Sequence, residues 1–144
     1  MIRNEKEYEA TTRRIADADR ALAAQRAALE AGGFAPDEVR RGLEPAEAMR
    51  AGLLEELAWY ERVRTGEVGV LTGIARIGEL LIAARIAAGV SQRDLAERLG
   101  VSEAQISRDE RNEYHGITVE RVQRVMDALG GAVTIRYEGA PRVA

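Results

Sequence analysis

The chain has 144 residues, 46% of them hydrophobic, which is enough for one modest core or for one compact domain with an appendage. It contains no cysteine, so disulfides and thiolate metal sites are excluded and a reducing compartment is favoured. Neither a long apolar run nor a signal-like N-terminus is present, and we therefore expect a cytoplasmic protein with no membrane partner.

Charge gives no support for nucleic-acid binding by bulk electrostatics. The formal net charge is −3. Residues 1–70 hold 11 basic and 14 acidic side chains, and residues 71–144 hold 10 of each. Any contact with DNA must therefore come from a local face whose acidic neighbours point away.

The first 64 residues are predicted to form a coiled-coil-like helical hairpin. A long helix over residues 4–31 has an apolar residue at every seventh position, namely Tyr8, Ile15, Leu22 and Leu29. Gly32, Gly33 and Pro36 break it, and a second helix is expected over residues 45–64. Its apolar face comprises Met49, Leu53, Leu57 and Tyr60. An antiparallel pair is the simplest solution, although intermolecular coiling would bury the same residues.

Residues 65–73 contain three glycines and are predicted to be a linker to a second domain, residues 74–144. That domain opens with a helix that ends at Gly89. Its apolar stripe comprises Ile74, Ile77, Leu80, Leu81, Ala84 and Ala88.

Residues 91–110 indicate two short helices, each with its own cap. Ser91 precedes a helix whose third residue is Asp94, and Ser102 precedes another whose third residue is Gln105. Both starts resemble capping boxes, in which the serine hydroxyl accepts from the third backbone N–H. Two caps this close together leave room for one short helix and a turn.

Gly100 falls at this turn, where the left-handed backbone conformation is easily adopted only by glycine. Four apolar residues are spaced to fill the angle between the helices: Leu95, Leu99, Val101 and Ile106. This layout is typical of a helix-turn-helix DNA-binding motif.

A last helix and a strand are predicted after the motif. Thr118 caps a helix whose inward residues are Val122, Val125, Met126 and Leu129, and Gly130 and Gly131 stop it. Residues 132–138 then alternate apolar and polar side chains, as a strand does, with Val133, Ile135 and Tyr137 on one face. Because no other convincing strand exists, we expect these three residues to pair with a second copy across a two-fold axis, or less favourably with residues 68–71.

Several spaced residues together resemble the Cro/C1-type (XRE) helix-turn-helix family: Gln92, Leu95-Ala96, Gly100-Val101-Ser102, Ile106-Ser107-Arg108 and Glu110. The resemblance covers residues 74–129 and implies a lambda-repressor-like domain, so the whole chain is expected to be all-α apart from the short C-terminal strand. Asp109 departs from the pattern, since the family more often has an apolar residue there. We expect Tyr114 to fill the resulting gap.

The resemblance implies base-edge contacts from the second helix of the motif, at Glu103, Ala104, Gln105 and Arg108 with Ser107 close by, and a backbone or bridging contact from Gln92. The hydrogen-bonding patterns of these side chains suit this role, because arginine can bind guanine and glutamine adenine through two bonds each. Phosphate contacts are expected from arginines on both helices of the motif, namely Arg93, Arg98, Arg108 and Arg111, and Ser102 is also expected to contact DNA.

We therefore expect a transcriptional regulator, most simply a repressor, that binds double-stranded DNA as a homodimer. Two modules related by a two-fold axis read an inverted repeat whose half-sites lie roughly 34 Å apart. The alternative is an antitoxin of a toxin-antitoxin pair, which would repress its own operon and bind a toxin through another segment. A phage-type regulator released by a partner on the hairpin is a third hypothesis. In each, the hairpin provides dimer or partner contacts.

Catalysis is not expected. His115 is the only histidine, and no motif gathers carboxylates around it. The sequence accordingly predicts no enzyme, no metal and no cofactor.

Overall fold

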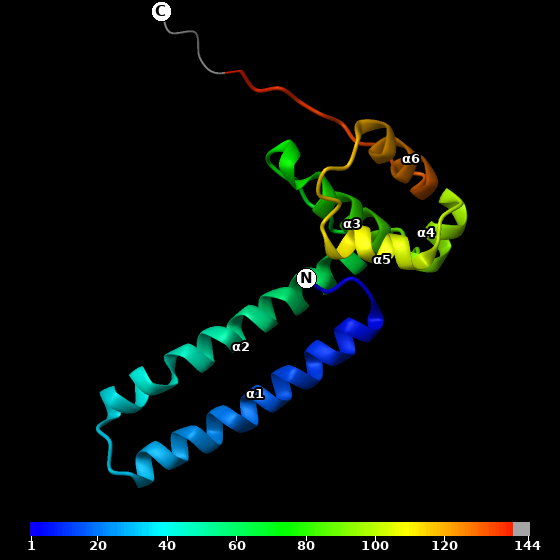
Figure 1. The fold of residues 1–144 in the computed structure, drawn as a ribbon. Helices are drawn as coiled ribbons and strands as arrows, with labels where there is room; N and C mark the ends of the chain where they lie inside the picture. Colours follow the sequence, from blue (N-terminus) through cyan, green and yellow to red (C-terminus); the bar gives the residue numbers. More distant parts are fainter. Residues whose placement is uncertain (140–144) are drawn as a thin grey trace, which may run out of the picture. The chain divides into compact units, whose positions relative to one another are not determined.

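The computed structural model describes residues 1–139, which contain six α-helices and one short 3-10 helix (Figure 1). In chain order these are α1 (Glu5–Ala31), α2 (Pro36–Arg64), η1 (Ile74–Arg76), α3 (Ile77–Ala87), α4 (Gln92–Leu99), α5 (Glu103–Arg111) and α6 (Val119–Leu129). The predicted all-helical class is thus confirmed. None of the helices within residues 1–139 is long and apolar enough to cross a membrane.

The chain divides into two compact units. The first comprises Met1–Val70 with Ile86–Gly89, and the second comprises Leu71–Arg85 with Val90–Ala144. The division between Val70 and Leu71 falls inside the glycine-containing segment 65–73.

The first unit is built on the hairpin of α1 and α2, which run antiparallel (Figure 1). Asn4 caps α1 by accepting a hydrogen bond from the backbone N–H of Glu7 at 2.9 Å. The four heptad residues predicted on α1 are each half-buried, and Thr11, one turn after Tyr8, is buried. The heptad seam is therefore closed within the chain.

Helix α2 begins earlier than predicted. Pro36 is its first residue, a position where the missing N–H would have no helical partner anyway, and Glu38 accepts a hydrogen bond from the backbone N–H of Ala35 at 2.8 Å. Pro45, the predicted start, lies inside the helix. The added turns bury Val39 and Leu43, which are 4% and 0% exposed. Their burial explains why α2 continues through a proline.

The predicted apolar face of α2 needs a second correction. Leu53 and Tyr60 are buried and Leu57 is half-buried, whereas Met49 is 59% exposed. The buried positions step from Val39 to Leu53 and Tyr60 in multiples of seven, and Met49 lies outside this series.

The core of the second unit is formed by α3, α4, α5 and α6. Its fully buried apolar residues are Leu81, Ile82, Leu95, Ile106 and Val125. Gly78 lets α3 approach the loop after α5, because a Cβ atom on Gly78 would lie 1.8 Å from the backbone oxygen of Glu113.

The predicted strand over residues 132–138 is wrong for the single chain. No strand occurs among residues 1–139, and residues 68–71 form no ladder with this segment. Ile135 and Tyr137 are 75% and 89% exposed. The alternating pattern is present, but a strand also needs a partner for its backbone groups, and the described chain supplies none.

Candidate nucleic-acid interface

Helices α4 and α5 form the predicted helix-turn-helix, and their caps are observed. The Ser91 hydroxyl accepts from the N–H of Asp94 at 3.0 Å, and the Asp94 carboxylate accepts in return from the N–H of Ser91 at 3.2 Å. The Ser91 hydroxyl also donates to the Asp94 carboxylate at 2.7 Å, and this bond, together with the one from the Ser91 N–H, lowers the pKa of Asp94. Ser102 Oγ accepts from the N–H of Gln105 at 3.2 Å, so it caps α5 through a single bond.

The turn between the helices is set by Gly100 and by buried side chains behind it. Gly100 has a φ of 67°, in the left-handed region as predicted. Leu95, Ala96 and Ile106 are at most 2% exposed. Burial of these three side chains holds the angle between α4 and α5.

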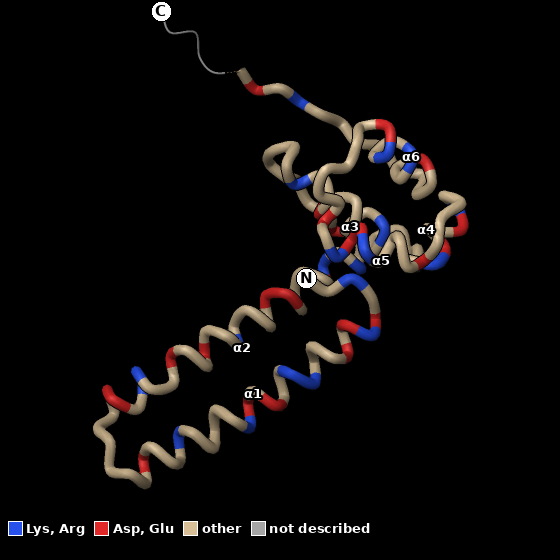
Figure 2. Tube along the Cα trace, in the orientation of Figure 1, with Lys and Arg blue, Asp and Glu red and all other residues tan. Residues whose placement is uncertain are grey.

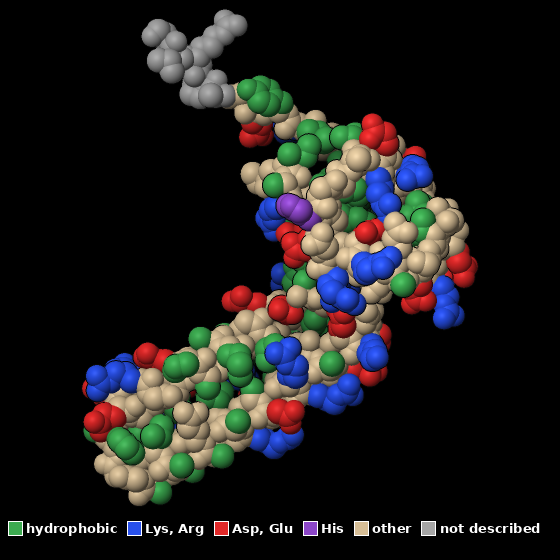
Figure 3. Space-filling view, viewed as in Figure 1, with side chains coloured by type: hydrophobic (Ala, Val, Ile, Leu, Met, Phe, Trp, Pro, Cys, Tyr) green, Lys and Arg blue, Asp and Glu red, His purple; other side chains and the backbone are tan. Residues whose placement is uncertain are grey.

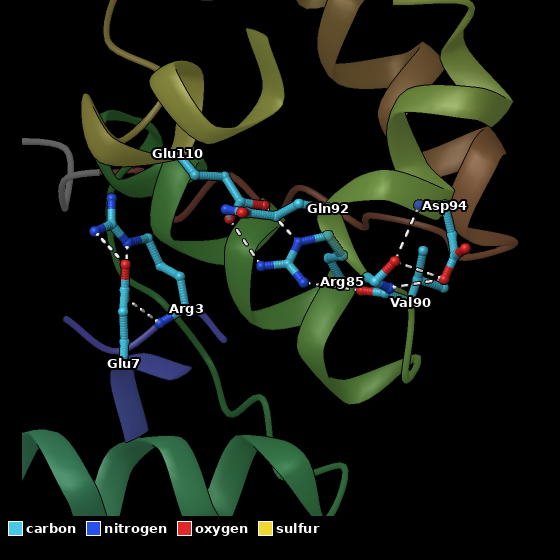
Figure 4. A network of polar contacts seen from close by, with 8 residues as sticks. Arg3, Glu7, Arg85, Val90, Gln92, Asp94 and Glu110 are labelled. Atoms are coloured by element: carbon cyan, nitrogen blue, oxygen red, sulfur yellow. Dashed lines mark hydrogen bonds and ion pairs between the residues drawn. The ribbon is translucent and has the colours of Figure 1, made fainter. Parts of the chain in front are cut away.

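A buried ion pair fixes α5 from behind (Figure 4). Arg85 of α3 donates from Nη2 to Glu110 Oε2 at 2.8 Å and from Nε to Oε1, and the two side chains are 4% and 0% exposed. Arg85 Nη1 also donates to the backbone oxygen of Val90 at 2.8 Å, and Gln92 Nε2 donates to Glu110 Oε2 at 2.7 Å. The carboxylate of Glu110 is thus bound by α3 and α4 together.

Figure 4 also shows Arg3 bonded to Glu7 at the start of α1.

The C-terminal end of α5 is held by residues that replace the expected apolar contact. Asp109 forms an ion pair with Arg121 of α6. Tyr114 is 4% exposed, as expected of a residue filling the gap beside Asp109, and its backbone N–H donates to the Asp109 oxygen at 2.7 Å. Burial raises the pKa of Tyr114. Glu113 and Tyr114 both have positive φ, at 49° and 51°, so the loop is sharply turned here.

Three of the ten predicted DNA contacts lie exposed on α5 without a partner in the described part of the chain. Ala104, Arg108 and Arg111 are exposed, and neither arginine makes a hydrogen bond or ion pair within residues 1–139. Gln105 and Ser107 are half-buried on the same helix. Arg108 and Arg111 therefore have their full donor sets available for an external acceptor.

The other five predicted contacts are engaged inside the domain. Gln92 is half-buried and bound to Glu110, and Ser102 caps α5. Arg98 donates to the backbone oxygen of Ala128 at 2.9 Å, near the end of α6, where a cation stabilises the free carbonyls. Arg93 and Glu103 come together as an exposed ion pair at 3.5 Å. Arg93 nevertheless keeps 73% of its side chain accessible.

Basic and acidic residues are mixed over the described part of the second unit. Figure 2 shows basic and acidic positions interspersed along α3 to α6, in agreement with the equal counts in this half of the chain. Figure 3 shows arginine side chains and carboxylates side by side on the visible face. The residues available to bind DNA are therefore few, and they lie at separate positions instead of forming one basic surface.

Sequence reasoning missed Arg85 and Arg121. Arg85 lies in a strongly apolar helix, and its isolation there was a signal for a buried partner, since a fully buried arginine is rare unless it is paired. For the link between Arg121 and Asp109, the one signal was Asp109 at a position where the family more often has an apolar residue, and nothing in the sequence marked Arg121 as its partner. Within residues 1–139, no group of three His, Cys, Asp or Glu side chains is arranged to hold a metal ion.

The sequence model of the Helix-turn-helix family matches residues 81–135, which include α4, the turn, α5 and α6. No curated protein and no solved structure is similar enough to the chain to give a match.

Proposed function

We propose that this protein is a DNA-binding regulator of the Cro/C1 type, a repressor that reads an inverted repeat as a dimer. The match of residues 81–135 to the Helix-turn-helix model supports the proposal. In the proposal, α5 enters the major groove of each half-site, and α4 crosses the sugar-phosphate backbone of the DNA.

The observation that carries the proposal is the contrast between the two sides of α5. Its inner side is held by Ile106 and by the Glu110–Arg85 ion pair. On its outer side, Arg108 and Arg111 are exposed and unpaired within the described part of the chain. A rigid helix that carries free donors is suited to reading base edges, since the donors keep their position when the groove is met.

Individual roles follow from side-chain chemistry. Arg108 can donate to O6 and N7 of guanine, Gln105 can bind adenine, and the Ala104 methyl group suits thymine. Glu103 can accept from the cytosine amino group if its exposed pair with Arg93 opens, which costs little at a surface.

Dimerisation is proposed because one such module contacts too few base pairs to select a site. Two modules related by a two-fold axis would span half-sites roughly 34 Å apart. Ile135 and Tyr137, large and mostly exposed, provide apolar surface for a second copy.

An antitoxin role is the second candidate, and the exposed apolar residues of the first unit favour it. Phe34 and Met49 are 52% and 59% exposed on the hairpin. A protein partner such as a toxin would cover residues of this kind.

The decisive experiment is selection of bound sequences from random duplex DNA with the full chain. An inverted repeat is the expected result, and Arg108→Ala should lose the preference at one position in each half-site. Enrichment of a single half-site would refute dimeric reading, and enrichment of no sequence at all would refute the proposed function. Co-purification of a second chain that Met49→Glu abolishes, with DNA selection intact, would identify the antitoxin role.

A further inference from the structure

A groove in the second unit lies directly beyond the end of α5. It encloses about 710 Å³, within the usual range for small-molecule sites. One wall comes from η1 and the start of α3, another from α6, and the loop after α5 connects them. The segment after α6 borders the groove through Val133 and Ile135.

The walls of this groove are aliphatic rather than aromatic. Ile74, Val119 and Ile135 all line it, and each is about three-quarters exposed, at 73%, 76% and 75%. Any apolar ligand that covers these branched aliphatic side chains removes them from water, which lowers the free energy. Tyr114 and His115 are the only lining residues with a ring, and the remaining apolar wall is aliphatic, so the walls suit an alkyl chain better than a stack of flat rings.

The polar groups of the groove are concentrated in the loop after α5. Arg111 is the only Lys or Arg that lines it, and this guanidinium has no partner within residues 1–139. The hydroxyl of Tyr114 is buried and also lacks a hydrogen-bond partner in the described residues. Glu113 is the one acidic lining residue. An anionic group at the Arg111 end would satisfy a free cation beside an apolar cavity.

We propose that this groove binds an aliphatic carboxylic acid, whose alkyl chain packs between Ile74 and Val119 and whose carboxylate pairs with Arg111. Arg111 is also the last residue of α5 and a predicted phosphate contact. The bound acid therefore competes with DNA for Arg111 and weakens operator binding. This regulatory consequence rests on the proposed function, whereas the binding of the acid does not.

The binding test uses titration calorimetry with decanoate and with the uncharged decanol on the full chain. We expect saturable binding of one decanoate per chain, with decanol about tenfold weaker because it lacks the charge-assisted bonds. Arg111→Gln should bring decanoate down to the decanol affinity and leave decanol unchanged. Glu113→Gln should tighten decanoate binding, because it removes the opposing carboxylate.

A matched pair of variants locates the site. Val119→Glu puts a carboxylate into the groove at the first residue of α6, where the helix dipole tolerates it. Val70→Glu makes the same change at a valine that is 95% exposed and does not line the groove. Decanoate binding should be lost in the first and kept in the second. Binding lost or kept equally in both variants, or no saturable binding at ~1 mM decanoate, would overturn the proposal.

The regulatory step is tested separately, with DNA selected as above. Decanoate should weaken DNA binding by the natural chain, while the Val119→Glu variant should bind DNA equally with and without it. If decanoate binds but no DNA sequence is ever selected, the site stands and the proposed function fails. If DNA is selected but decanoate does not bind, this inference fails alone. A further outcome concerns a dimer that binds no decanoate. If Val119→Glu dissociates this dimer and Val70→Glu does not, a second copy of the chain covers the groove, and the inference is also wrong.

Discussion

At the scale of single residues, two groups of side chains lie at the candidate interface. One group fixes α5 to the core of the domain, and the other lies on the exposed side of α5. Glu110 is fully buried and bound by Arg85 and Gln92, whereas Arg108 is exposed and free within the described residues. The family resemblance grouped Gln92 with the DNA contacts. Its bond to Glu110 also makes it part of the support that keeps α5 in position, and its contact with DNA stays a prediction.

Arg108→Ala should lower the affinity for the best DNA site by about 1 to 3 kcal/mol, because one bidentate contact with a base is lost. The loss should vanish on a site mutated at that one base pair. Binding of labelled duplexes by fluorescence anisotropy measures both. Arg124 is an exposed arginine on α6, so Arg124→Ala is the matched control. It should leave the affinity for the best site and the affinity for the mutated site unchanged. Equal losses for the two variants would contradict the assignment of α5 as the recognition helix.

Arg85→Met should lower the free energy of unfolding by about 3 to 5 kcal/mol, because Glu110 would remain as a buried charge without its counter-ion. Replacing both residues, as Arg85→Met with Glu110→Leu, should recover most of that loss. Urea denaturation of the single and double variants checks this. A double variant as unstable as the single one would show that the ion pair itself, and not the orphaned charge, governs stability.

At the scale of elements, packing decided where helices begin and how closely they approach. Helix α2 continues through Pro45 because Val39 and Leu43 are buried by the turns before it. Helix α3 reaches the loop after α5 because residue 78 has no side chain. Both features concern contacts between segments distant in sequence, which local propensity does not encode.

Gly78→Ala should destabilise the second unit by about 3 kcal/mol, since the added Cβ would meet the Glu113 backbone and neither segment can yield without moving the core. Gly52→Ala is the matched control in α2. No atom lies within 4 Å of a Cβ there, so the same change should stabilise the chain by about 0.5 to 1 kcal/mol. Thermal unfolding followed by circular dichroism tests both, and a neutral Gly78→Ala would disprove the close approach.

Pro45→Ala should stabilise the hairpin by up to about 3 kcal/mol, because it restores an N–H that can bond the Arg41 carbonyl and removes the clash of the ring. Helical circular dichroism should rise slightly as well. If α2 instead began at Pro45, where a proline is favourable, the substitution would destabilise the protein.

At the scale of the whole molecule, the balance of charge determines how DNA binding depends on salt. The half of the chain with the helix-turn-helix has equal numbers of basic and acidic residues, so only the few arginines that reach phosphates release counter-ions. The arginines predicted at phosphates are not equivalent, because Arg98 is bonded to the end of α6 and Arg93 is largely exposed.

Arg93→Gln should weaken binding to all DNA sequences alike and reduce the slope of log affinity against log salt by about 1. Arg98→Gln should lower thermal stability instead, with the slope nearly unchanged, because it removes a bond to the Ala128 carbonyl. Affinities measured at several salt concentrations distinguish the two. A flatter slope for Arg98→Gln than for Arg93→Gln would reverse these roles.

Most of the local structure could be predicted because its causes lie within a few residues of each other. Ser91 with Asp94, Gly100 and the heptad of α1 each depend on near neighbours, and each was found where the sequence placed it. The strand at residues 132–138 failed for a related reason. Its alternation is local, but a strand exists only with a ladder partner.

The amino-acid sequence by itself determined the helical class, the helix-turn-helix and the residues that α5 can present, because helix caps, the turn glycine and hydrophobic spacing act over a few positions. Only the tertiary structure decided which arginines are free, what holds α5, and that a groove opens beyond it. Arg85 stands out in an apolar helix, but the sequence does not show which residue pairs with it, or with Arg98 or Arg121. Their partners come from distant segments, and only the packing of α3 to α6 brings those partners within bonding distance.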